Sequence, residues 1–119
     1  MSDEFSVFNE AKYVYDSISM LENLIKECRE TLYMDRNIIY DFMDFSMYLF
    51  GEYIRLGKIY EKEIPLFTRA YADSAKLALE LFERKMINEG QLKNLLFYKK
   101  DVLKLQRKYA KRLKKSLKY

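Results

Sequence analysis

The chain has 119 residues, of which half are apolar and a third are charged, and its formal net charge is +4. This balance is typical of one globular domain with a hydrophobic core, and it excludes a disordered chain. Three Gly, one Pro and many Leu, Lys, Glu and Tyr favour helix throughout. No stretch approaches the roughly 20 apolar residues that cross a membrane.

The first predicted helix covers residues 3–34. Its apolar residues recur three and four positions apart, which is typical of a helix that packs along one seam. The seam consists of Ala11, Val14, Ile18, Leu21, Ile25, Cys28 and Leu32. Because nothing interrupts this spacing, we expect one long helix here.

The second predicted helix covers residues 36–56 and is apolar on most sides. Five apolar residues lie outside its main seam, namely Ile38, Met43, Phe45, Met47 and Phe50. A helix of this kind is either central in the core or covered by a partner chain. These five residues are therefore a candidate interface, and they predict a homodimer or a subunit of a complex. The alternative is a large core.

Two further helices are predicted over residues 65–87 and 91–117. Pro65 suits a first helical turn, where its missing N–H group would have no partner. The connections between all four helices are short, which favours antiparallel neighbours. We therefore expect a single all-α domain over residues 1–119, an up-down four-helix bundle with long first and last helices.

The last predicted helix is strongly basic. Residues 91–119 contain eleven Lys or Arg and one acid, Asp101, a net charge of +10; the preceding ninety residues contain eleven bases and seventeen acids, a net charge of −6. At about 100° per residue, seven of these bases point within about 40° of one direction. They are Lys93, Lys100, Lys104, Arg107, Lys111, Lys114 and Lys118, and Lys108, Arg112 and Lys115 widen one flank of the row.

Such a row of bases suits a polyanion, since each Lys or Arg that contacts a phosphate releases a bound counterion. The helix dipole favours bases in the last turns, but it does not account for a row along most of the helix. Acids of the first two predicted helices could neutralise its edges. The opposite face is predicted to pack in the core through Leu92, Leu95, Val102, Leu103, Tyr109, Ala110, Leu113 and Leu117.

The sequence thus favours a non-catalytic nucleic-acid-binding protein, with DNA and RNA both open as ligands. An acidic protein surface is the alternative partner, in which case the chain is an adaptor that docks through the apolar faces of the first two helices. A membrane surface is the least favoured partner, because the leucines opposite the bases are needed for the core.

Catalytic chemistry is not expected. The chain has no His, and its one cysteine, Cys28, lies in the predicted seam, so neither a catalytic triad nor a Cys–His pair can form. We expect no cofactor and no metal site. A single cysteine fits a cytoplasmic protein, and the absence of His with only two Gln favours a thermophilic source.

Overall fold

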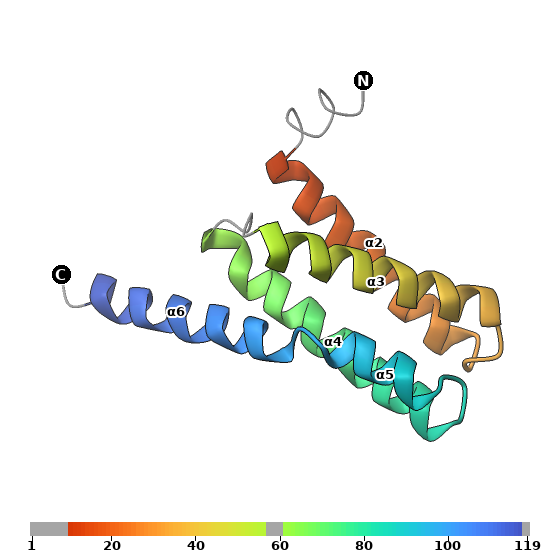
Figure 1. The fold of residues 1–119 in the computed structure, drawn as a ribbon. Helices are drawn as coiled ribbons and strands as arrows, with labels where there is room; N and C mark the ends of the chain where they lie inside the picture. The colour runs from red at the N-terminus through yellow and green to blue at the C-terminus, as the bar shows by residue number, and fades with distance from the viewer. Residues whose placement is uncertain (1–9, 57–60, 118–119) are drawn as a thin grey trace.

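The computed structural model describes residues 10–56 and 61–117, and in this part of the chain all regular secondary structure is helical. The elements are α2 (Glu10–Glu30), α3 (Arg36–Leu56), the short 3₁₀ helix η1 (Glu61–Glu63), α4 (Ile64–Glu83), α5 (Glu89–Leu96) and α6 (Lys99–Leu117) (Figure 1). The all-helical class predicted from the sequence is confirmed. The predicted start of the first helix, over residues 3–9, lies outside the described residues. None of the described helices is long and apolar enough to span a membrane.

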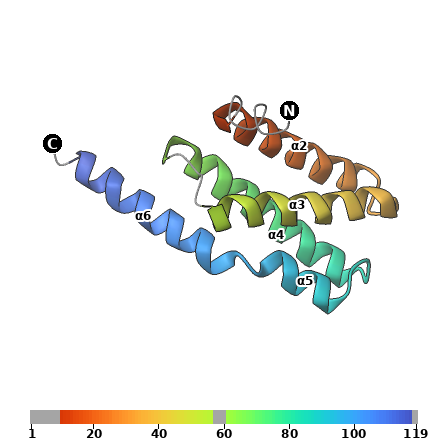
Figure 2. The same ribbon diagram turned by 45° about the horizontal axis from the view of Figure 1, so that its top comes forward.

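The helix α4 lies at the centre of the packing. It packs against α2, η1, α5 and α6, while α2 also packs along α3 (Figures 1 and 2). Between α3 and α4, three aromatic rings meet edge to face: Phe50 lies 5.4 Å from Phe67 and 5.0 Å from Tyr71, measured between ring centroids. Such aromatic pairs add stability beyond the area that they bury. The hydroxyl of Tyr71 then donates to the backbone carbonyl of Leu95 at 3.3 Å, which fixes α5 against α4.

The candidate interface on α3 is largely part of the core. Met43 and Phe50 are buried, so the prediction that they form an exposed interface is wrong. Ile38, Phe45 and Met47 are half-buried and pack against the core cluster. The reason is that α3 is covered on two sides, by α2 and by the aromatic side chains of α4, so its additional apolar residues are used within the chain.

The helix α2 ends at Glu30, four residues before the predicted end. The N–H of Tyr33 donates to the carbonyl of Cys28, and the N–H of Leu32 donates to that of Arg29, both at 3.0 Å. These two bonds form a Schellman cap, which requires a left-handed residue after the helix. Leu32 takes this conformation with φ of 57°, although Gly is the usual residue there.

A second cap of this kind ends α4 at Glu83 instead of near residue 87. Met86 N–H donates to Leu81 at 2.8 Å, Lys85 N–H donates to Phe82 at 3.0 Å, and Lys85 has φ of 60°. The next helix, α5, begins at Glu89, two residues before the predicted start. Its first turn is closed by a capping box, in which the side chains of Asn88 and Gln91 each accept a 2.8 Å bond from the other residue's N–H.

The single last helix predicted over residues 91–117 is interrupted at Phe97 and Tyr98. There the N–H of Phe97 bonds to the carbonyl of Asn94, one residue closer than in an α-helix. Tyr98 is half-buried, and its hydroxyl oxygen lies only 2.8 Å from the position that a Cβ on Gly51 of α3 would take. Tyr98 thus packs against α3 at the point where α5 ends and α6 begins.

Candidate nucleic-acid interface

The helix α6 starts on the bundle and ends beyond it. Val102 is buried and Leu105 and Tyr109 are half-buried, whereas every described residue from position 110 onward is exposed. In Figures 1 and 2 the C-terminal half of α6 extends past the ends of the other described helices. The helix is about 28 Å long at 1.5 Å per residue, so its outer half offers solvent a long surface.

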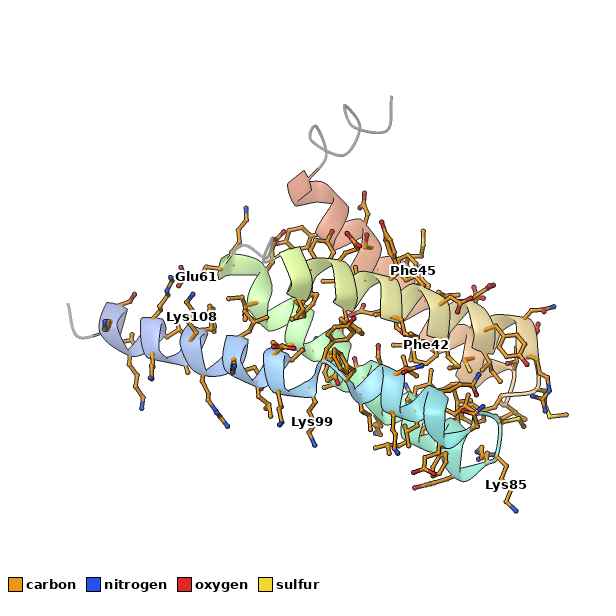
Figure 3. All side chains as sticks on the ribbon, in the orientation of Figure 1. Phe42, Phe45, Glu61, Lys85, Lys99 and Lys108 are labelled. Carbon is orange, nitrogen blue, oxygen red and sulfur yellow. The ribbon has the colours of Figure 1, made fainter. Side chains whose placement is uncertain are left out.

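The bases of α6 form an exposed row along this surface. All nine Lys and Arg of the helix are exposed. The central row consists of Lys100, Lys104, Arg107, Lys111 and Lys114. At about 100° per residue these five side chains fall within an arc of about 80°, and they extend along about 21 Å of the helix. In Figure 3, side chains that end in nitrogen, Lys99 among them, project from the side of α6 that faces away from α3 and α4.

Little of this charge is neutralised within the described residues. Arg112 forms an ion pair with Glu61 of η1, with 2.9 Å between Nη1 and Oε2. None of the other eight bases of α6 has an ion-pair partner in residues 10–56 and 61–117. The acids of α2 and α3, which the sequence offered as neutralising partners, form no ion pair with α6 in the same part of the chain. The row is therefore a concentrated positive charge that faces solvent.

The flank of the row next to the bundle has a mixed charge. A cleft of about 440 Å³ separates α6 from η1 and from the adjoining ends of α3 and α4. Three bases, Lys104, Lys108 and Arg112, line it together with the two acids Glu61 and Asp101. Figure 3 shows Lys108 on the side of α6 that faces Glu61, opposite to Lys99. Because the acids lie only on this flank, a polyanion would meet the outer row first.

Two predicted members of the row are not on α6 as the structure describes it. Lys93 lies on α5, before the interruption at Phe97, and it forms an exposed ion pair with Glu89 at 3.4 Å. The alignment of Lys93 with the other bases assumed one continuous helix over residues 91–117, and that continuity is wrong. Lys118 lies outside the described residues. Lys115 is exposed on α6, as are Lys108 and Arg112, the other two flanking bases.

The leucines of α6 are more exposed than the sequence predicts. Leu103, Leu113 and Leu117 were expected in the core, but they are 38%, 46% and 86% exposed, and Ala110 is exposed as well. Two of them, Leu113 and Leu117, lie in the part of α6 that extends past the other described helices, so none of those helices covers them. The sequence contains a sign of this, because the helix predicted over residues 91–117 is longer than the one predicted over residues 65–87, and its end could therefore extend past that helix.

A separate polar cluster joins α2 to α4. The hydroxyl of Tyr33 donates to Glu80 at 2.6 Å, Arg29 lies 3.5 Å from the same carboxylate, and the guanidinium of Arg84 stacks 4.6 Å over the Tyr33 ring. The hydrogen bond from Tyr33 and the charge of Arg29 hold the pKa of Glu80 below its ordinary value, and the same bond raises the pKa of Tyr33. Arg29 and Tyr33 come from the end of α2 and the turn after it, and Glu80 and Arg84 come from the end of α4 and its cap, so the cluster holds these two ends together.

Comparison of the chain with protein-family models, with curated proteins and with solved structures found no match.

Proposed function

We propose that this chain is a non-catalytic nucleic-acid-binding protein, an up-down helical bundle that uses α6 for sequence-independent contacts to phosphates. The observation that supports the proposal is the row of five exposed bases, none of which has an ion-pair partner among the described residues. A nucleic acid presents phosphates at regular intervals, and a straight row of bases about 21 Å long can contact several of them at once. A small anion would occupy only one or two of these bases.

The chemistry of the row indicates low sequence specificity. Four of its five members are Lys, which acts as a point charge. Arg107 is the only member that could form bidentate hydrogen bonds to a base edge. Neither Asn nor Gln lies within the row. We therefore expect contacts to the phosphate backbone, and only small differences in affinity between sequences.

The proposal is tested by titrating short fluorescent duplex DNA, single-stranded DNA and RNA with the chain, following anisotropy at several salt concentrations. The decisive variant reverses Lys100, Lys104, Arg107 and Lys111 to Glu. We expect the wild-type chain to bind at low salt and this variant to lose about 100-fold or more in affinity. Circular dichroism checks that the helices remain.

A matched control distinguishes the effect of the row on affinity from the effect of net charge. Reversing Lys26, Arg69, Lys76 and Lys85 to Glu changes the net charge by the same amount, on surfaces of α2 and α4 and the turn after α4. This control should keep most of the affinity. The proposal fails if the wild-type chain binds no nucleic acid at low salt, or if the two variants lose the same affinity.

A further inference from the structure

A second row of residues runs along α6 beside the bases. It consists of Leu103, Gln106, Ala110, Leu113 and Leu117. Successive members are three, four, three and four residues apart, which is the repeat of a coiled-coil seam. All five are exposed. At about 100° per residue, the centre of this row lies about 90° around the helix from Val102, Leu105 and Tyr109, which face the bundle. The fold of the described chain therefore leaves this seam uncovered.

The charges beside the seam follow the same repeat. Lys100, Arg107 and Lys114 are seven residues apart and lie next to the seam, on the side away from the bundle. In a coiled coil these positions form ion pairs with the partner helix and so select the partner. With bases at all three positions, the seam is complementary to a helix that carries acids along its edge.

We propose that this seam docks an α-helix of a partner protein, one with leucine-like residues on one face and acidic residues beside them. This inference goes beyond the proposed contact with nucleic acid. The lysines at positions 104, 108, 111 and 115 point away from the seam, at about 120° to 180° from its centre. A docked helix would leave these four lysines exposed to phosphates.

The charge on α6 argues against a second copy of the same chain in the seam. The helix carries nine bases and one acid, a net charge of +8. Pairing two such helices would bring like charges together along their whole length, which is destabilising. A membrane surface is a poorer fit, because the seam is only about 80° wide and contains Gln106 and Ala110, whereas helices that lie in lipid have a broad apolar face.

The test uses the full chain and a synthetic helical peptide with Leu at the two seam positions of each heptad and Glu at the flanking positions. A second peptide has Lys in place of each Glu. We expect the acidic peptide to bind and the basic peptide not to bind. Replacing Leu113 and Leu117 by Ser should lower the affinity for the acidic peptide at least about tenfold, because both exposed side chains become buried on docking. The same variant should bind nucleic acid as the wild type does, so this test is independent of the proposed function.

Charge variants test the flanking positions. Reversing Lys100, Arg107 and Lys114 to Glu should abolish binding of the acidic peptide and permit binding of the basic one. Reversing Lys108 and Lys115, which lie away from the seam, should have a much smaller effect. Binding that is insensitive to the leucine substitutions overturns the inference, as does absence of binding.

Two further results also overturn it, in favour of another occupant. Self-association of the wild-type chain in light scattering, lost when Leu113 and Leu117 are replaced by Ser, identifies a second copy. Flotation with phosphatidylserine vesicles, lost in the same variant, identifies a membrane surface.

Discussion

Glu61 and Arg112 form an ion pair between η1 and α6, with 2.9 Å between the carboxylate oxygen and the guanidinium nitrogen. Both side chains are about half exposed, so the pair contributes at most about 1 kcal/mol to stability. The buried side chain of Val102 and the contact of Leu105 with the core cluster therefore hold the N-terminal half of α6 against the bundle. The ion pair lies near the point where α6 leaves the bundle, and its acid is the one carboxylate among the described residues that neutralises a base of α6.

Replacing Glu61 by Gln should strengthen nucleic-acid binding several-fold at low salt, because Arg112 then becomes available to phosphates. The free energy of unfolding in urea should change by less than about 1 kcal/mol. Glu83→Gln is the matched control, since it removes one acid at the far end of α4. If both variants strengthen binding equally, net charge rather than the ion pair sets the affinity.

Gly51 and Tyr98 should be energetically coupled. A Cβ at position 51 would lie 2.8 Å from the Tyr98 hydroxyl oxygen and 3.6 Å from the ring carbon that carries it. Ala is favoured over Gly inside a helix by about 1 kcal/mol, but here it must displace the hydroxyl. Gly51→Ala should therefore stabilise the chain by about 1 kcal/mol more in a Tyr98→Phe background than in the wild type. Urea denaturation of the four chains measures this coupling, and additive effects would show that Tyr98 moves freely.

Replacing Lys85, the left-handed residue in the cap that ends α4, by Gly should stabilise the chain. Lys85 has φ of 60°, a conformation that costs residues with a side chain roughly 1–2 kcal/mol. Part of this gain is offset because Gly is more flexible in the unfolded chain, so Lys85→Gly should stabilise by about 0.5–1 kcal/mol. Lys85→Ala keeps the Cβ and should change the thermal midpoint little. An equal gain with Ala would mean that the charge, and not the backbone conformation, is responsible.

The Tyr33–Glu80 contact should make stability depend on pH in the acid range. The pKa of Glu80 in the folded chain lies below its ordinary value of 4.5, mainly because Tyr33 donates to the carboxylate. The contact therefore adds stability above about pH 4.5, and this contribution is lost as the pH falls through the lowered pKa.

Tyr33→Phe removes the hydroxyl and keeps the ring under Arg84. It should cost about 1 kcal/mol at neutral pH, and the difference from the wild type should shrink in acid. Urea denaturation at a series of pH values measures it. A difference that stays constant into strong acid would contradict this explanation.

Cys28 should be unreactive in the folded chain. Its side chain is fully buried, and burial raises the pKa of the thiol from 9.0 to about 11. At mildly alkaline pH the thiolate population is then about 100-fold lower than in the unfolded chain. Iodoacetamide labelling followed by mass spectrometry should be at least about 100-fold slower in buffer than in denaturant. Similar rates in both would mean that α2 opens readily.

The helical class and the positions of the bases could be predicted from the sequence, because each depends on local spacing and composition. The ends of α2 and α4 could not, since their caps place Leu32 and Lys85 in a conformation for which Gly is the expected signal. The interruption between α5 and α6 contains neither Gly nor Pro. At this interruption Tyr98 lies against Gly51, a residue far away in the sequence, and no local pattern indicates this contact.

On the surface of α6, too, local spacing predicts some features, whereas others depend on tertiary structure. Its amphipathic spacing indicated that bases and leucines lie on different sides of the helix. Whether Leu113 and Leu117 are covered depends on where the neighbouring helices end, which no local pattern specifies. Phe50, predicted to lie at an interface on α3, is instead buried, because α4 supplies aromatic side chains that cover it.

The salt dependence of duplex DNA binding tests the role of the basic row most directly. The logarithm of the binding constant should fall linearly with the logarithm of salt concentration, with a slope of about −0.9 for each phosphate contacted. In a chain with Lys104 and Lys111 both replaced by Gln, the slope should become less steep by about 2, because two contacts are lost. A slope that these substitutions leave unchanged, with DNA still bound, would contradict the assignment of α6 as the phosphate-contacting surface.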